Sequence, residues 1–213
     1  MRRSCMERKN FFVYSFGAIL IAGAMWFFIS DGDARIDIPQ RGEAIIAFGD
    51  SLIEGVGASA GNDFVSILSS RLQTPIIGAG VSGDTTVSGL ARLERDVLSK
   101  NPRVVIVLLG GNDAIRRLPP TETFANLESI INRIHEKGAG VLLVGVRGGL
   151  LGDAYKSEFK ALARKTKVSF VPNILEDIFA HTDLMYDSIH PNNRGHLLMA
   201  DRIEPILRAM IGR

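Results

Sequence analysis

Short apolar runs alternate with longer stretches of helical periodicity from residue 44 to the end of the chain. Two runs, VVIVLL at 104–109 and VLLVGV at 141–146, are almost entirely apolar, which is typical of strands covered on both faces. The runs predict strands at Ala44–Phe48, Ile76–Ala79, Val104–Leu109, Val141–Val146 and Val168–Val171.

Amphipathic patterns with a helical period fill most of the segments between these strands. They predict helices at Asp63–Gln73, Thr86–Lys100, Thr121–Lys137, Asp153–Lys165 and Asn193–Met210. Strands that alternate with helices form a parallel sheet with helices on both faces, because each helix returns the chain to the same end of the sheet. The pattern therefore predicts an α/β fold with five parallel strands.

A basic flank and a long uncharged stretch distinguish the first 30 residues. Arginine or lysine stands at positions 2, 3, 8 and 9, and residues 10–30 carry no charge. A helix over Phe11–Ile29 would span roughly 28 Å at about 1.5 Å per residue, close to the hydrocarbon thickness of a bilayer. Because basic flanks stay in the cytoplasm, the rest of the chain would lie outside it. We predict a signal or transmembrane anchor at 1–30, a polar linker at 31–43 and a globular domain at 44–213.

Residues Ala22, Gly23 and Ala24 form a small-x-small pattern of the kind cut by signal peptidase. Cleavage after Ala24 would leave the apolar stretch MWFFIS at the new N-terminus. We therefore favour an uncleaved inner-membrane anchor over a cleaved periplasmic form, with the domain extracytoplasmic in both cases.

Composition limits the possible partners. The chain has 213 residues, 46% of them hydrophobic, which suits one globular domain and an additional segment. The formal net charge is +2, and no long basic run interleaved with aromatics indicates a nucleic-acid partner. The one cysteine, Cys5, excludes an intrachain disulfide framework. His135, His181 and His196 lack ligand spacing, so we expect no metal site.

Residues with catalytic potential follow the ends of four predicted strands. Ser51 follows the first strand in IIAFGDSLIEGVGAS, Gly83 follows the second, Asn112 follows the third and His190 follows the fifth. Ligands bind outside the carboxyl ends of strands in parallel α/β sheets. We therefore expect these residues to meet at one edge of the sheet.

Their chemistry suits acyl transfer. A serine hydroxyl such as that of Ser51 is a weak nucleophile until a base, here His190, takes its proton. Asp187 stands three residues before His190 and is placed to orient the imidazole and stabilise its charged form. Backbone N–H groups of Ser51 and Gly83 and the Asn112 side chain are candidate donors to an oxyanion. Each motif alone is more typical of a turn or helix cap, and their joint occurrence favours an active site.

Four sequence blocks resemble those of the SGNH, or GDSL-type, hydrolases, which carry Ser, Gly, Asn and His in this order. The blocks are AFGDSLIEGVGAS, GAGVSGDTTVSGLARL, LGGND and DSIHPN, and the likeness covers roughly Ala44 to Leu207. They are similar in particular to the bacterial periplasmic branch with thioesterase, arylesterase and lysophospholipase activity. The resemblance implies a flavodoxin-like three-layer α/β/α sandwich. It also implies Ser51, Asp187 and His190 as catalytic residues, and Ser51, Gly83 and Asn112 as the oxyanion hole.

We therefore expect a membrane-tethered serine esterase that hydrolyses small acyl esters or thioesters through an acyl-enzyme, without metal or cofactor. The resembling family covers the acyl chain with the loop after the oxyanion asparagine, so Ile115 and Leu118 are predicted to bind substrate. Leu150 and Leu151 are added because their glycine-rich loop follows the fourth strand at the same edge. The sequence of that loop, 147–153, fits two roles equally well, a flexible lid over the site or a simple connection between strand and helix.

Two alternatives remain open. The same catalytic groups would serve a carbohydrate O-acetylesterase. A non-catalytic lipid or glycan binding protein on this fold is the other, although a pure binder has no need of both Ser51 and His190.

Overall fold

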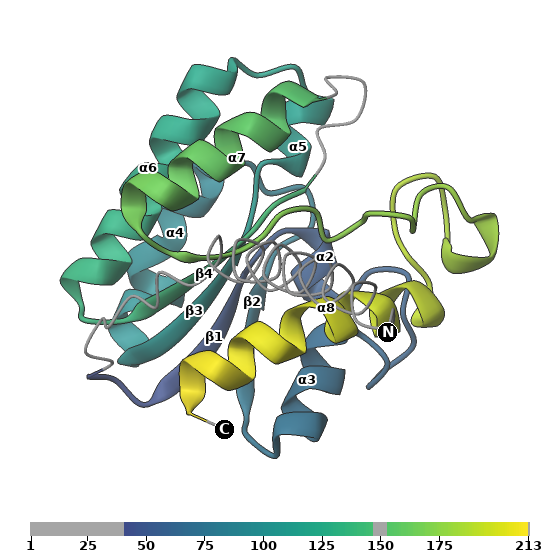
Figure 1. The fold of residues 1–213 in the computed structure, drawn as a ribbon, viewed down its shortest axis with the longest axis horizontal. Coiled ribbons are helices and arrows are strands. Elements are labelled where there is room, and N and C mark those ends of the chain that lie inside the picture. The colour runs from purple at the N-terminus through teal and green to yellow at the C-terminus, as the bar shows by residue number, and fades with distance from the viewer. Residues whose placement is uncertain (1–40, 147–152, 213) are drawn as a thin grey trace, which may run out of the picture. The chain divides into compact units, whose positions relative to one another are not determined.

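Five parallel strands form the centre of the computed structural model, which describes residues 41–146 and 153–212 (Figure 1). The strands are β1 Ala44–Gly49, β2 Ile76–Gly80, β3 Pro102–Leu108, β4 Gly140–Val144 and β5 Ser169–Val171. Their order in the sheet is β2-β1-β3-β4-β5, which is the order of flavodoxin-like folds. The predicted α/β class and the five-stranded parallel sheet are confirmed.

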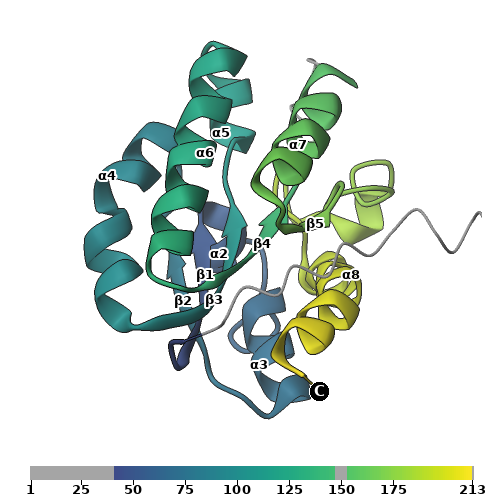
Figure 2. The ribbon, with the colours of Figure 1, turned by 60° about the vertical axis from the view of Figure 1, so that its left-hand side comes forward.

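Helices cover both faces of the sheet (Figure 2). On one face lie α4, α6 and α7, and on the other α3 packs against α8. The bounds are α3 Phe64–Leu72, α4 Thr86–Asp96, α6 Pro120–Glu136, α7 Asp153–Thr166 and α8 Asn193–Ile211. Shorter elements are α2 Ser51–Glu54, α5 Gly111–Ile115 and the 3-10 turns η1 Leu98–Lys100 and η3 Thr182–Leu184.

The core lies on the two faces of the sheet. Every side chain from Val104 to Leu109 is fully buried, as expected for a strand with helices above and below it. The buried residues of α6 recur at helical spacing, which places one apolar stripe against the strands. Burial of each such side chain stabilises the fold by about 1.5–3 kcal/mol.

The helix predicted over Thr86–Lys100 is broken in the structure. Helix α4 ends at Asp96, Val97 leaves the helical region at φ −128° and ψ −62°, and Leu98 begins the turn η1. Val97 and Leu98 are both buried, so the break turns two consecutive apolar side chains into the core. The sequence pattern also does not predict α2 and α5, because four or five residues are too few to show a helical period.

The predicted anchor at 1–30 and nearly all of the linker at 31–43 lie outside the described residues. Within the ranges 41–146 and 153–212, no helix is both long enough and apolar enough to cross a membrane. The division of the chain at residues 30 and 43 therefore stays a prediction.

The order of the strands in the sheet indicates where a ligand can bind. From β1 the chain moves outward to β2 and then crosses to β3 on the opposite side of β1. The loops that follow β1 and β3 therefore diverge at the carboxyl edge, and the gap between them is where α/β proteins bind ligands. Ser51 and Asn112 follow these two strands.

The end of β1 leaves no room for a side chain. A Cβ atom on Gly49 would lie 2.1 Å from the carbonyl oxygen of Leu108 and 2.7 Å from Cγ1 of Ile53. We expect Gly49→Ala to lower the free energy of unfolding by about 2 kcal/mol or more, measured by urea unfolding, because the change overpacks a dense region. Gly78→Ala on the edge strand β2 is the control, since the added Cβ would meet no described atom within 4 Å. Equal losses in both variants would contradict this expectation.

Candidate active site

The turn between β1 and α2 presents Ser51. Asp50 caps α2, and its Oδ1 accepts the Leu52 N–H at 3.1 Å. Gly55 ends the helix at φ 90°, a left-handed conformation that favours glycine. Ser51 is thereby the first residue of α2, just beyond the carboxyl end of β1.

A chain of hydrogen bonds joins Ser51 to residues far along the sequence. Ser51 Oγ lies 3.1 Å from His190 Nε2, across a separation of 139 residues. His190 Nδ1 lies 2.8 Å from Asp187 Oδ2. A neutral ring with its hydrogen on Nδ1 satisfies both contacts, because Nδ1 then donates to the carboxylate and Nε2 accepts from the hydroxyl. The structure thus brings the three predicted catalytic residues together.

Asp187 also shapes its own loop. Its Oδ1 accepts the backbone N–H groups of Ile189 and His190, each at 2.8 Å. The hydrogen bond to His190, assisted by these two, lowers the pKa of the Asp187 carboxyl to about 2. Asp187 therefore stays ionised at neutral pH and is ready to stabilise a charged imidazole.

Asn192 fixes the loop that carries His190, a role that the sequence analysis missed. Its side-chain oxygen caps α8 by accepting the N–H groups of Arg194 and Gly195. Its amide nitrogen donates to the carbonyl oxygens of Asp183 at 2.9 Å and Met185 at 3.3 Å. One side chain therefore anchors both sides of the loop to the start of α8. An asparagine directly before a predicted helix was the available signal, since asparagine is a preferred N-cap.

The three candidate oxyanion donors come from three separate segments, which follow β1, β2 and β3. Asn112 lies in α5, and its Nδ2 donates one hydrogen to the backbone oxygen of Asp84 at 2.9 Å. The second hydrogen makes a longer bond of 3.4 Å to Asp50 Oδ2. Among the described residues, the backbone N–H groups of Ser51 and Gly83 donate to no protein acceptor. The two backbone donors therefore keep their hydrogens for a ligand, whereas Asn112 would have to exchange its longer bond to Asp50 for one to the oxyanion.

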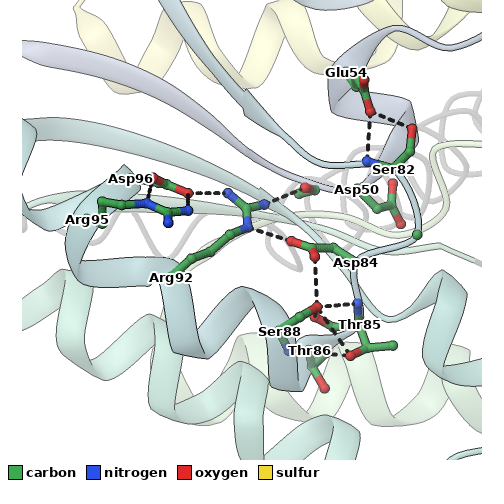
Figure 3. Close-up of polar contacts among 12 residues, drawn as sticks. Asp50, Glu54, Ser82, Asp84, Thr85, Thr86, Ser88, Arg92, Arg95 and Asp96 are labelled. Atoms are coloured by element: carbon green, nitrogen blue, oxygen red, sulfur yellow. Dashed lines mark hydrogen bonds and ion pairs between the residues drawn. The ribbon is translucent and has the colours of Figure 1, made fainter.

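The loop around Gly83 is held from two sides. Gly83 adopts φ 80°, which favours glycine, and its carbonyl oxygen accepts from Arg116 Nη2 at 2.8 Å. The preceding residue, Ser82, donates both its N–H and its hydroxyl to the Glu54 carboxylate of α2 (Figure 3). The contacts of Ser82 tie the Gly83 loop to the helix that begins with Ser51, and the contact of Arg116 ties it to the end of α5.

Comparison with known proteins settles the family. The model of the GDSL-like lipase/acylhydrolase family matches residues 47–198, a range that includes all the predicted catalytic and oxyanion residues. The chain belongs to this family. The predicted resemblance is confirmed, and membership makes the protein a serine ester hydrolase, as predicted.

Two curated relatives and one solved structure show how far the likeness extends. The hydrolase is 29% identical to esterase TesA of Pseudomonas aeruginosa over 207 residues, which cover 91% of this chain and 99% of TesA. It is 30% identical to thioesterase 1/protease 1/lysophospholipase L1 of Escherichia coli K12 over 177 residues, covering 79% and 85% of the two chains. A crystal structure of TesA matches it with a TM-score of 0.75 at 29% identity, covering 79% of this chain and 99% of that one.

The predicted substrate-binding residues are only partly placed. Ile115 ends α5 and is 58% exposed, and Leu118 is half-buried. Leu150 and Leu151 lie outside the described residues. A hollow of about 700 Å³ opens elsewhere in the hydrolase, lined by Val56, Gly57, Ala58, Ser59, Tyr186, Asn192, Asn193 and Arg194. Neither Ile115 nor Leu118 lines this hollow, and the substrate roles of all four residues stay predictions.

The histidines outside the catalytic loop have structural or surface positions. His196 is fully buried, accepts the Phe64 N–H at Nδ1 and donates from Nε2 to the carbonyl oxygen of Val56. Burial lowers the pKa of His196, which favours the neutral ring that makes both bonds. In the described part of the hydrolase, no group of three or more His, Cys, Asp or Glu side chains is arranged to hold a metal.

Burial next to Ser51 raises the pKa of Asp50. The residue is 4% exposed, and desolvation raises the pKa of its carboxyl from 3.8 to about 6, against the opposing hydrogen bond from Leu52. A carboxyl with a raised pKa in the folded state favours folding while it is protonated. This contribution is complete below about pH 4 and is lost as the pH rises through about 6.

We therefore expect wild type to lose about 3 kcal/mol of unfolding free energy relative to Asp50→Asn between about pH 4 and pH 8, because each unit of pKa corresponds to about 1.4 kcal/mol. The new amide would face the Asn112 amide and change the unfolding free energy by the same amount at every pH. The comparison therefore uses only the part of the unfolding free energy that varies with pH. Denaturant unfolding across this pH range measures it. Glu176→Gln, at an exposed carboxylate, controls for net charge. A difference between wild type and Asp50→Asn that does not vary with pH would contradict this assignment.

Proposed function

We propose that the protein hydrolyses acyl esters and thioesters through an acyl-enzyme on Ser51, with His190 as base and Asp187 as its orienting partner. The observation that carries the proposal is the continuous hydrogen-bond chain from Ser51 Oγ through His190 to Asp187. Such a chain lets the hydroxyl lose its proton as it attacks, while the carboxylate stabilises the resulting imidazolium.

In the acylation step, Ser51 Oγ attacks the acyl carbonyl and His190 Nε2 takes its proton. The carbonyl oxygen becomes an oxyanion that accepts hydrogen bonds from the Ser51 and Gly83 N–H groups. Asn112 Nδ2 gives a third, with the hydrogen that it donates to Asp50 Oδ2 at 3.4 Å before substrate binds. Preorganised donors of this kind stabilise the tetrahedral intermediate more than the substrate. Collapse of the intermediate breaks the ester or thioester bond, and the leaving alcohol or thiol takes the proton from His190.

In the deacylation step, water attacks the acyl-enzyme and passes a proton to His190. A second tetrahedral intermediate forms with the same donors and collapses to the free acid and the Ser51 hydroxyl. The names of the two curated relatives, an esterase and a thioesterase with lysophospholipase activity, support this range of leaving groups.

We assign the acyl chain to the side chains that follow the oxyanion asparagine. Ile115 presents an exposed apolar surface three residues after Asn112, and Leu118 follows on the same loop. Leu150 and Leu151 are assigned to the same surface from their place after β4. A carbohydrate O-acetylesterase would have no use for an apolar surface of this length.

We also propose that the domain lies outside the cytoplasm on an uncleaved anchor. The support is the basic flank before the uncharged stretch at residues 10–30. The enzyme would then meet its esters in the periplasm or at the outer surface of the inner membrane.

The first prediction of the proposed function concerns the nucleophile. A fluorophosphonate probe should label wild type on Ser51 and should not label Ser51→Ala, whose kcat should fall by about 10⁴-fold or more because the covalent route is lost. Ser188→Ala, at an exposed serine of the His190 loop, is the matched control and should label normally. Labelling that survives in Ser51→Ala would end the assignment.

The second prediction concerns chain length. Ile115→Ala should lower kcat/KM for an octanoyl p-nitrophenyl ester by roughly 5- to 30-fold and leave the acetyl ester nearly unchanged, because about 0.8 kcal/mol is lost per buried CH₂. Ile77→Ala on β2 is a control of the same chemistry at another exposed isoleucine. Equal losses on both esters would assign Ile115 to the fold. A wild type that strongly prefers acetate would favour the carbohydrate O-acetylesterase.

The third prediction concerns the N-terminus. The mature protein should begin at or near Met1 and fractionate with membranes, because an uncleaved apolar helix partitions into the bilayer. N-terminal sequencing and membrane fractionation measure this. A mature protein that begins at Met25 would show cleavage after Ala24.

A further inference from the structure

Arg92 is a buried cation that the catalytic mechanism does not use. It lies on α4 with 8% of its surface exposed, and its guanidinium carbon stands 4.3 Å above the ring of Phe48 in β1. Charged side chains are seldom buried this far unless they are paired with other polar groups. The hydrogen-bond partners of the guanidinium group therefore account for the buried position of Arg92.

The guanidinium group donates in three directions. Nε binds the buried carboxylate of Asp84, Nη1 binds Asp96 at 3.0 Å and Nη2 binds the carbonyl oxygen of Gly49 at 2.8 Å. Figure 3 shows Arg92 extended between Asp84 and Asp96. The fork of a guanidinium group suits this pattern, because its N–H groups point outward in one plane at fixed angles.

Two of these contacts end beside the candidate oxyanion donors. Asp84 directly follows Gly83, and the backbone oxygen of Asp84 accepts the hydrogen bond from Asn112 Nδ2 at 2.9 Å. Gly49 stands two residues before Ser51, and its carbonyl oxygen also accepts the Val81 N–H at the start of the Gly83 loop. Arg92 therefore ties the end of β1 to the loop that sets the positions of Gly83 and Asn112.

The charge of Arg92 is balanced within its own network. Asp84 and Asp96 are its two carboxylate partners, and Asp96 is also bound by Arg95 at 2.7 and 2.9 Å. Two cations facing two anions give this network no net charge. The contribution of Arg92 to catalysis would therefore come from geometry, and donors a few tenths of an ångström out of place lose much of their effect.

We propose that Arg92 is the positioning residue of the oxyanion hole, holding the Ser51, Gly83 and Asn112 donors in one arrangement through Gly49 and Asp84. The proposal rests on the proposed function for the identity of the donors. It does not place Arg92 in contact with substrate.

The test compares Arg92→Lys and Arg92→Ala with Arg95→Ala on the full-length protein. Arg92→Lys keeps the charge but loses the fork, so kcat for a p-nitrophenyl ester should fall about 10- to 100-fold with KM changed less than about threefold, since oxyanion donors act mainly in the transition state. The rate of fluorophosphonate labelling should fall in parallel, because the phosphoryl oxygen uses the same donors. Arg95→Ala is the matched control, since Arg95 binds the same network from a side chain that is 76% exposed. It should keep wild-type kcat.

Chemical rescue separates positioning from folding. Methylguanidinium at millimolar concentration should restore part of kcat to Arg92→Ala and none to Asn112→Ala, with methylammonium at equal ionic strength as the control. If Arg92→Ala does not fold, the kcat of Arg92→Lys tests the proposal, and circular dichroism measures the folded fraction of that variant. Wild-type kcat per folded Arg92→Lys molecule would overturn the proposal, and so would a fall shared by Arg95→Ala. Failure of the proposed function is separate, because it appears as fluorophosphonate labelling that persists in Ser51→Ala.

Discussion

The place of β1 between β2 and β3 is the constraint on which the active site depends. Because the chain passes from β1 to β2 on one side and then returns to β3 on the other, the segments that follow β1 and β3 separate at the carboxyl edge. Ser51 begins the segment after β1, and Asn112 lies in the segment after β3. The close approach of Gly49 to the backbone of Leu108 keeps the two strand ends adjacent, so both loops begin from one rigid base.

Polar groups near this edge are buried at a cost that the core must offset. Asp50 is desolvated beside Ser51, and Asp84, which follows Gly83, forms a buried ion pair with Arg92. Removing one partner of such a pair leaves an unpaired buried charge, which is more damaging than replacing both by apolar groups. The polar network is therefore a specific arrangement that the surrounding helices and strands must hold, and its chief effect is to define the shape of the site.

The histidine loop is organised differently. Asp187 is exposed and holds its loop by accepting two backbone N–H groups, while Asn192 attaches that loop to α8. The proposed base, His190, thus lies on a short turn whose geometry is mostly local, whereas the proposed oxyanion donors depend on contacts between separate elements.

Local patterns in the sequence determined the fold class and the positions of most strands and helices. Apolar runs and helical periodicity located the strands and the long helices, because burial on both faces of a sheet leaves a continuous apolar signature. The three-residue spacing of Asp187 and His190 predicted their contact, since one turn is enough to form it. Only the tertiary structure decided the break at Val97, the bonds from Asn192 to Asp183 and Met185, and the placement of Arg92 against Asp84 and Gly49. These features depend on contacts that the packing of separate segments creates, and no local pattern in the sequence indicates them.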